Sequence, residues 1–381
     1  MTDRDIEAIR RNCTHVLNRH DTPTVKESMQ ALADFASEDS RPDMYGSGSL
    51  INTFEQEVAS MLGHESAVFM PSGTMAQQIA LRIWAERQNN FNVAFHPTAH
   101  LEIYEQTAYR ELHSLRGILV GNPHRLMTME DLEHIGRAVG VLLIELPQRE
   151  IGGALPTWDE LSSIIEWAKQ NDIKLHLDGA RLWECKPFYD RDYAEIAGQF
   201  DSVYVSFYKM LGGIAGAILA GPEDFIQEAK IWQRRHGGNL VQMYPYVLSA
   251  KMGMEKILPR VHIFHDKAVE IAAAIGQHPD IEITPDPPPT NMMHIFLKAS
   301  GKALKEASLD IAEEHGLWIG PWFGPTQIPT YQQYELSVAE PAVALETDYI
   351  SQCFTELMRR AQAYDAEWNK AYVPDESNVS R

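Results

Sequence analysis

The feature that most constrains this 381-residue chain is an alternation of short apolar runs with amphipathic stretches between about residues 50 and 258. The apolar runs are SAVFM (66–70), VGVLLIEL (139–146), DIKLHL (172–177), SVYVSF (202–207) and GAILA (216–220), and the expected helices between them include 74–88, 158–170 and 223–236. Strands that are apolar on both faces are typical of a parallel sheet covered by helices on both sides. The pattern therefore predicts an α/β fold with a mostly parallel sheet.

The rest of the chain suggests a three-part organisation. Residues 1–40 are expected to form an N-terminal arm, 41–258 a large cofactor-binding domain, and 259–381 a smaller C-terminal α/β domain. Within the last part, the stiff segment PDPPPT leads into a strand, NMMHIFL, and then a helix over about 302–315. The final eight residues, PDESNVSR, have the composition of a frayed tail.

Composition excludes several classes of protein. The formal charge of −20 disfavours nucleic acid as a partner, because phosphate neutralisation needs clustered Lys and Arg. No window has the eighteen or so apolar residues that a membrane helix needs, and the first thirty residues show no apolar export signal. The three cysteines are widely spaced, which argues against disulfides or a metal site. We expect a cytoplasmic protein that binds neither metal nor membrane.

The segment PSGTMAQQIALRIWAE (71–86) has the pattern of a phosphate seat. An apolar strand ends, Ser72, Gly73 and Thr74 form the turn, and a helix follows at once. Unpaired N–H groups at a helix N-terminus attract anions, and a glycine allows close backbone approach. An ordinary Ser/Thr helix cap explains the fragment equally well.

Two further residues stand at the ends of apolar strands. Asp178, in HLDGARLWE, could pair with a protonated pyridine nitrogen, although it could also cap the next helix. Lys209, in SVYVSFYKMLGG, could lose its proton in an apolar setting and attack an aldehyde, although most lysines lie on the surface. Ser206, three residues earlier, could donate a hydrogen bond to a phosphate.

A histidine completes the pattern. His100, in HPTAHLEIYEQ, could lie over a cofactor ring, with Glu105 nearby in sequence. Each signal is weak alone, but their order is informative: a phosphate turn, a histidine, an aspartate at a strand end, and a lysine about thirty residues later. This order resembles that of the pyridoxal 5'-phosphate (PLP) enzymes with the aspartate-aminotransferase-type fold, also called fold type I.

Within that superfamily the chain resembles the L-threonine aldolase and β-eliminating lyase family over most of its length. The resemblance lies in MYGSGSLINTFEQEVASMLG (44–63), FMPSGTMAQQ (69–78), HLDGARLWE (176–184), IAGAILAG (214–221) and TNMMHIFL (290–297). It implies a PLP-dependent lyase that acts on a small amino acid and assembles as a homodimer or homotetramer with shared active sites.

The resemblance also implies roles for single residues. Lys209 would hold PLP as a Schiff base, Asp178 would pair with the pyridine nitrogen, and His100 would stack on the ring and aid proton transfer. Ser72, Gly73, Thr74 and Ser206 would bind the phosphate. Arg181 would contact the substrate carboxylate, and Tyr45 would reach the active site of a neighbouring subunit.

The chain departs from the family pattern at several positions. Tyr208 and Met210 flank the lysine where the family has small residues, and Val241 stands where a basic residue is frequent. The C-terminal part should supply an arginine for the substrate carboxylate, yet residues 316–358 contain neither Arg nor Lys. Arg149 is the first candidate replacement and Arg19 the second, because bidentate capture of a carboxylate favours Arg.

Aromatic residues in the same region allow two interpretations. Trp318, Trp322 and Phe323 could line a pocket for a bulky substrate side chain, or they could pack in the core.

The leading hypothesis is retro-aldol cleavage of a β-hydroxy-α-amino acid, such as threonine or phenylserine, to glycine and an aldehyde. PLP-dependent β-elimination, or other chemistry at Cα, is the alternative that the altered carboxylate site keeps open. A dinucleotide-binding oxidoreductase is disfavoured, because YGSGSL lacks the third glycine and the preceding strand of that motif. A non-catalytic protein that retains the fold is also conceivable.

Overall fold

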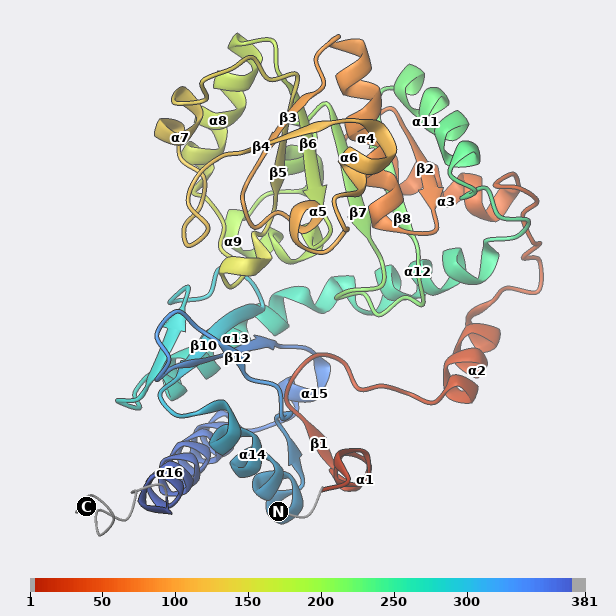
Figure 1. Cartoon of the computed structure of the whole chain (residues 1–381). Helices are drawn as coiled ribbons and strands as arrows, with labels where there is room; N and C mark the ends of the chain where they lie inside the picture. Colours follow the sequence, from red (N-terminus) through yellow and green to blue (C-terminus); the bar gives the residue numbers. More distant parts are fainter. Residues whose placement is uncertain (1–3, 372–381) are drawn as a thin grey trace, which may run out of the picture. The chain divides into compact units, whose positions relative to one another are not determined.

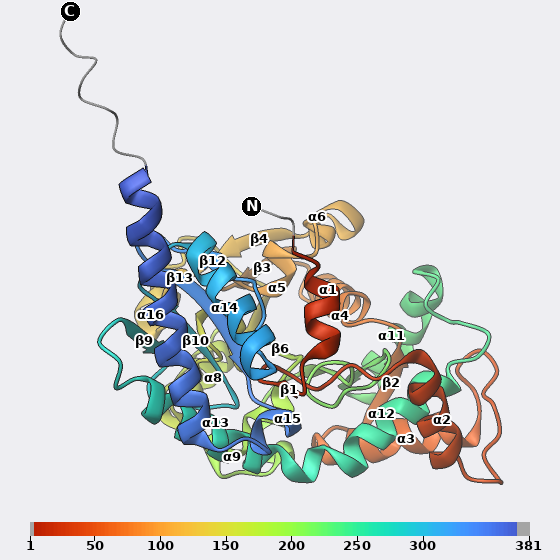
Figure 2. The same cartoon turned by 90° about the horizontal axis from the view of Figure 1, so that it is seen from below.

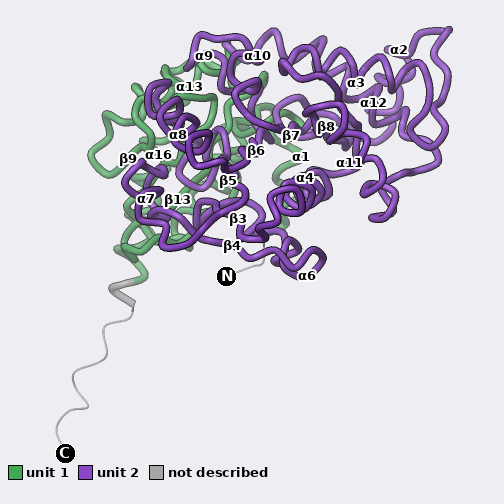
Figure 3. Tube along the Cα trace, turned by 90° about the horizontal axis from the view of Figure 1, so that it is seen from above, with its two compact units in different colours: residues 1–21, 263–381 green, residues 22–262 purple. Residues whose placement is uncertain are grey.

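The computed structural model describes residues 4–371, and the chain forms two compact units. Residues 22–262 make the larger unit, and residues 1–21 with 263–381 make the smaller one, as the colours of Figure 3 show. The expected arm, 1–40, is thus divided between the two units. The reason is a strand pair: β1 (His15–Val16) lies parallel to β11 (Leu317–Trp318) in the smaller unit. The three-domain division itself stays a prediction.

The larger unit contains a seven-stranded sheet with the order β2-β8-β7-β6-β5-β3-β4 (Figure 1). Its strands are β2 (Ser66–Met70), β3 (Asn92–Phe95), β4 (Arg116–Leu119), β5 (Val141–Glu145), β6 (Lys174–Gly179), β7 (Ser202–Ser206) and β8 (Ala217–Gly221). Only β8 runs antiparallel to its neighbours. The prediction of an α/β fold with a mostly parallel sheet is confirmed.

Successive residues of the strands belong to two different apolar clusters, one on each face of the sheet. Leu142 packs in the cluster formed with α3 (Ser49–Met61), α8 (Trp158–Gln170) and α12 (Tyr244–Lys256). Val141 and Leu143 pack in the cluster formed with α4 (Gly73–Arg87) and α11 (Glu223–Arg235). Both faces are therefore buried, which is why the strands are apolar throughout rather than alternating.

The remaining short helices of the larger unit connect these layers. They are α2 (Val25–Phe35), α5 (His100–Ile103), α6 (Ala108–His113), α7 (Met129–Glu133), α9 (Lys186–Tyr189) and α10 (Tyr193–Ala197), with 3₁₀ helices η1 (Arg149–Ile151), η2 (Leu182–Glu184) and η3 (Leu258–Arg260). Helix α13 (Val261–Ile275) begins in the larger unit and continues into the smaller one.

The smaller unit is built on an antiparallel sheet with the order β12-β13-β10-β9. Its elements are α1 (Ile6–Asn12), β9 (Ile281–Thr284), β10 (Met292–Leu297), α14 (Gly301–His315), β12 (Gly324–Pro325), β13 (Gln332–Ser337), α15 (Glu340–Val343) and α16 (Thr347–Ala371). Helices α14 and α16 pack together (Figure 2). The strand and helix expected after PDPPPT are β10 and α14, whereas the expected tail, 374–381, lies outside the described residues.

The larger sheet positions the site. Strands β2, β5, β6 and β7 run in the same direction, so their carboxyl ends share one edge. Glu145 lies beside Asp178 in this register, and Asp178 lies beside Tyr204. Ligand chemistry in open α/β sheets is found at this edge. Over residues 4–371, no helix combines the length and the apolar character needed to cross a membrane.

Strand β6 also carries a buried histidine that makes a prediction about acid stability. His176 is fully buried, and its Nδ1 lies 2.8 Å from the Ser202 hydroxyl. Burial lowers the pKa of His176 from 6.5 to about 3. Between these values the unfolded chain binds a proton that the folded chain does not. The contribution of His176 to the free energy of unfolding is therefore fully present above the unfolded-state pKa of 6.5. Below that pH it is lost by about 1.4 kcal/mol per pH unit.

Urea unfolding of the protein and of a His176→Gln variant, at a series of pH values between neutrality and the acid transition, measures this contribution. The variant should show a shallower loss of stability, because glutamine does not titrate. Identical slopes for the two proteins would contradict the assignment.

Candidate active site

The turn before α4 has the geometry that a phosphate seat requires. Strand β2 ends at Met70, and the Ser72 hydroxyl caps α4 by accepting the Met75 N–H at 3.3 Å. A side chain at Gly73 would collide with the Tyr204 ring, so only glycine fits there. Ser72 is thus a helix cap, and the cap and the anion seat are compatible, because capping leaves other N–H groups of the first turn available.

Two tyrosines beside this turn were not identified from the sequence. The Tyr204 and Tyr208 hydroxyls lie 3.3 Å apart. Burial raises the pKa of Tyr208, while the neighbouring Tyr204 hydroxyl and the Gly73 backbone act in the opposite direction. The only signal was the departure from the family pattern just before Lys209. The phenol of Tyr208 therefore lies at the turn that was predicted to bind phosphate.

Asp178 is a buried carboxylate at the end of β6, with 1% of its surface exposed. Its Oδ2 accepts a hydrogen bond from Gln77 Nε2 at 2.6 Å, and its Oδ1 accepts one from the Ala180 N–H at 3.1 Å. Burial raises the pKa of Asp178, whereas the positive charges of Lys209 and His100 lower it. The carboxylate is therefore held by fixed donors and lies near Lys209 and His100.

Lys209 is half-buried in the turn that follows β7. Burial lowers the pKa of Lys209, and the charge of Arg181 lowers it further, while Asp178 and Glu145 oppose this shift. Arg181 in turn lies 3.8 Å from Glu184. The structure thus brings Lys209, Asp178 and Arg181 into one electrostatic group, and it favours a neutral amine on the lysine.

Glu145 is a second carboxylate at this edge, and its proximity to Asp178 was missed. Its two oxygens accept hydrogen bonds from the Arg149 N–H and from Gln148 Nε2, both at 3.2 Å. Burial and the negative charge of Asp178 raise the pKa of Glu145. The sequence signal was a glutamate at the end of an apolar strand, but only the register with β6 shows that the two carboxylates are neighbours.

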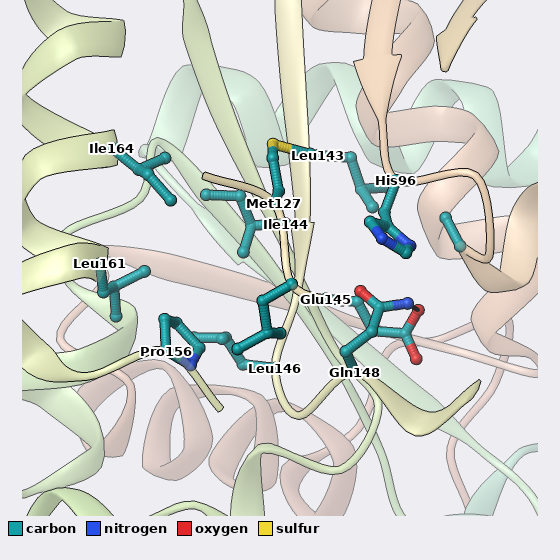
Figure 4. A pocket seen from close by; sticks show the side chains of 12 residues that line it. His96, Met127, Leu143, Ile144, Glu145, Leu146, Gln148, Pro156, Leu161 and Ile164 are labelled. Atoms are coloured by element: carbon teal, nitrogen blue, oxygen red, sulfur yellow. Dashed lines mark hydrogen bonds between the residues drawn. The ribbon is translucent and has the colours of Figure 1, made fainter. Parts of the chain in front are cut away.

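A small cavity of about 30 Å³ lies beside Glu145. Figure 4 shows Glu145, Gln148 and His96 on one side of it and apolar side chains, including Leu161 and Ile164, on the other. Its volume suits one or two water molecules. The cavity is lined mainly by core residues and by none of Ser72, Gly73 and Thr74, so it is not the predicted phosphate seat.

His100 belongs to a hydrogen-bonded chain. Its Nδ1 lies 3.0 Å from Glu105 Oε1, and Glu105 Oε2 accepts a hydrogen bond from Gln78 Nε2 at 2.8 Å. Glu105 is buried, with 7% of its surface exposed. A carboxylate at Nδ1 favours the tautomer that carries the proton there, which leaves Nε2 as the basic nitrogen.

The other expected site residues have varied surroundings. The Ser206 hydroxyl donates a 2.7 Å hydrogen bond to the Ala180 carbonyl, so its proton is already engaged, and its role toward phosphate stays a prediction. The Arg149 guanidinium pairs with Glu150 at 3.0 Å and lies over the Tyr104 ring at 5.6 Å.

Arg19 and Tyr45 take part in none of the contacts described above. Arg19 belongs to the smaller unit, where it pairs with Glu335 at 3.0 Å. Tyr45 is 55% exposed and lines a separate open cavity of about 560 Å³ together with Lys230 and Arg234. The role of Tyr45 toward a neighbouring subunit stays a prediction.

Of the aromatic residues that could line a substrate pocket or pack in the core, Trp318 packs in the core. Trp318 is buried in a cluster with Ile9 and Leu309. Trp322 meets the Trp318 ring edge-on, with the ring centroids 6.0 Å apart. Unlike buried Trp318, it is 70% exposed and does not belong to the core.

Comparison with known proteins identifies the family. The sequence model described as "Beta-eliminating lyase" matches residues 19–300. The chain belongs to this family. It is 41% identical to a Listeria monocytogenes protein whose structure was solved as a candidate L-allo-threonine aldolase, with a TM-score of 0.89 over 93% of this chain and 98% of the other.

Two other relatives belong to the same group of lyases and aldolases. An Exiguobacterium candidate aromatic amino acid β-eliminating lyase/threonine aldolase is 40% identical, with a TM-score of 0.88, over 93% of this chain and 99% of that one. The low-specificity L-threonine aldolase 1 of Arabidopsis thaliana is 25% identical over 285 residues, which cover 72% of this chain and 79% of the relative. The β-eliminating lyase family member described here is thus a fold-type I, PLP-dependent lyase.

The residues present fit PLP. The Gly73 turn can seat the phosphate, the buried Asp178 carboxylate suits a protonated ring nitrogen, and half-buried Lys209 suits a covalent anchor. Among residues 4–371 there is no cluster of three or more His, Cys, Asp or Glu side chains that could hold a metal ion.

Replacement of Gly73 tests the seat. A Gly73→Ala variant should bind PLP on the order of tenfold more weakly or worse and lose about 1–3 kcal/mol of stability, because the new methyl group overpacks against Tyr204. Titration of the apoprotein with PLP and urea unfolding measure both effects. Gly136→Ala is the control, since nothing lies near that position. Unchanged affinity in Gly73→Ala would contradict the assigned seat.

Proposed function

We propose that this lyase cleaves the Cα–Cβ bond of a β-hydroxy-α-amino acid of the threonine or phenylserine type, giving glycine and an aldehyde. The observation that carries the proposal is the grouping of Lys209 and Asp178 with a histidine, His100, whose Nδ1 is held by a buried glutamate. The Listeria candidate L-allo-threonine aldolase and the Arabidopsis low-specificity L-threonine aldolase support the same reaction class.

The cofactor supplies an electron sink for the pair that is released when the Cα–Cβ bond breaks. Lys209 is the covalent anchor, and its lowered pKa favours the neutral, nucleophilic amine. Asp178 would stabilise a positive charge on the ring nitrogen of the bound cofactor. Ser72, Gly73 and Thr74 form the phosphate seat in this proposal, with Ser206 as a helper.

His100 is the proposed base for the substrate hydroxyl. Glu105 accepts the Nδ1 proton, so Nε2 is free to remove the β-hydroxyl proton as the carbonyl of the aldehyde forms. The resulting imidazolium is stabilised by the same carboxylate. A proton must then return to Cα to release glycine, and protonated His100, which has just taken up the β-hydroxyl proton, can supply it.

Arg181 and Arg149 are the proposed contacts of the substrate carboxylate. Arg181 lies in the electrostatic group of Lys209. The backbone of Arg149 is tied to Glu145, and its guanidinium lies over the Tyr104 ring. Arg149 is thereby attached to the strand edge that carries Asp178, which supports it over Arg19, whose guanidinium pairs with Glu335 in the smaller unit.

The proposal includes a cytoplasmic homodimer or homotetramer in which Tyr45 reaches a neighbouring site. Exposed Tyr45 lines an open cavity with the basic side chains of Lys230 and Arg234, a surface that could face a second copy.

β-Elimination is the second candidate reaction. It is favoured by the lack of any Arg or Lys between residues 316 and 358, which alters the carboxylate site. The Exiguobacterium relative is named as a candidate for either activity, β-eliminating lyase or threonine aldolase.

Product analysis separates the two reactions. With L-threonine, L-allo-threonine and phenylserine, we expect glycine and the matching aldehyde, and Lys209→Ala should abolish both the reaction and the borohydride-fixed cofactor. Formation of a 2-oxo acid and ammonia without glycine would sink the retro-aldol proposal and support elimination. Glycine formation that survives in Lys209→Ala would contradict the anchor.

The carboxylate contact is tested at Arg149. An Arg149→Ala variant should raise KM about 10- to 100-fold with a smaller effect on kcat, because a charge-assisted hydrogen bond is removed. Arg359→Ala is the matched control, since that arginine pairs with Glu356 on an exposed helix surface. An unchanged KM would exclude Arg149 and leave Arg181 as the contact.

A further inference from the structure

Two adjacent glutamines on α4 bind two different carboxylates of the site. Gln77 and Gln78 are each only 1% exposed, on a helix whose other buried residues are mostly apolar. Gln77 Nε2 donates to Asp178 at 2.6 Å, and Gln78 Nε2 donates to Glu105 at 2.8 Å. Burial of an amide in a core costs free energy unless hydrogen bonds compensate for it. The burial of these two amides is therefore explained by the hydrogen bonds that they donate to Asp178 and Glu105.

We propose that Gln77 and Gln78 are positioning residues with separate tasks: Gln77 fixes the carboxylate that faces the cofactor ring nitrogen, and Gln78 fixes His100 through Glu105. The inference rests on the proposed roles of Asp178 and His100. It extends them to residues that neither the sequence pattern nor the resemblance identified.

Gln77 acts on the direction and charge of the Asp178 carboxylate. One oxygen is held by Gln77 from α4 and the other by the Ala180 backbone from the loop after β6, so the carboxylate plane cannot rotate. The hydrogen bond from Gln77 also favours the ionised form against the effect of burial on the pKa of Asp178. Its loss should weaken the pairing with the cofactor.

Gln78 acts one step further from the reacting atoms. Glu105 Oε2 is held by Gln78, which leaves Oε1 directed at His100 Nδ1. Without this donor the carboxylate can rotate, and the Nδ1 tautomer of His100 is less well defined. The effect should appear in proton transfer and not in cofactor binding.

The amide oxygens support this assignment. The Oε1 atoms of Gln77 and Gln78 are buried and accept no hydrogen bond from the described part of the chain. Each amide is therefore oriented by the hydrogen bond that it donates to its carboxylate. Its own oxygen stays buried without a hydrogen bond from the described residues. Such a cost of about 1–3 kcal/mol is expected where function rather than stability selects the side chain.

The experiment compares Gln77→Leu with Gln78→Leu, each serving as the control for the other. We expect Gln77→Leu to weaken PLP binding to the apoprotein about 10- to 100-fold, and to shift the pH titration of the visible spectrum of the bound cofactor. Gln78→Leu should keep PLP affinity within about twofold and an unchanged spectrum, but lower kcat and alter the pH profile of kcat/KM.

A general structural role is tested with Gln233→Leu. Gln233 is likewise buried, but its amide donates to the Phe69 carbonyl at 2.8 Å. This variant should lose stability without a change in either readout. If a leucine variant does not fold, Gln77→Glu and Gln78→Glu keep the shape of the side chain while placing one carboxylate against another. They should reproduce the same separation of effects.

Gln78 must also act through Glu105. In a Glu105→Gln background, the further change Gln78→Leu should have no additional effect on kcat or its pH profile. Additive effects, equal loss of PLP by both glutamine variants, or normal PLP binding by Gln77→Leu would overturn the proposal. Cofactor binding and spectra need no substrate, so failure of wild-type protein to form glycine would instead refute the proposed function.

Discussion

The burial of the Asp178 carboxylate is the interaction on which the rest of the site depends. A charged group that is 1% exposed is stable only where donors and cations replace water. Here those groups come from separate elements: an amide from α4, a backbone N–H after β6, and the positive charges of Lys209 and His100. The same contacts that oppose the rise of the Asp178 pKa on burial also assemble the site.

Charge balance extends this network across the sheet edge. Glu145 lies beside Asp178 and shares the influence of Lys209 and Arg181. Two buried carboxylates in neighbouring strands disfavour simultaneous ionisation, whereas nearby cations favour it. The lysine is affected by the same charges in the opposite sense. A change in the protonation of one of these groups therefore shifts the pKa of the others, as is typical of interacting groups at catalytic sites.

Helix α4 links the separate parts. Its first turn contains Gly73 of the proposed phosphate seat, and its second turn carries Gln77 and Gln78. A rigid helix of 15 residues thus fixes the distance between the phosphate end, the ring-nitrogen end and the histidine of the proposed site. Elements that are rigid position reactive groups more accurately than loops do.

Local sequence by itself determined the strands of the larger sheet and the order of the site motifs along the chain. Continuous apolar runs predicted the strands β2, β5, β6, β7 and β8, because both faces of the sheet are buried, and the motifs around Gly73, Asp178 and Lys209 indicated the cofactor and family. Only the tertiary structure decided that Glu145 neighbours Asp178, that Tyr208 reaches the Gly73 turn, and that Gln77 and Gln78 bind carboxylates 101 and 27 residues away. Strand register and helix packing create these contacts, and a local pattern carries no information about which distant residues will meet.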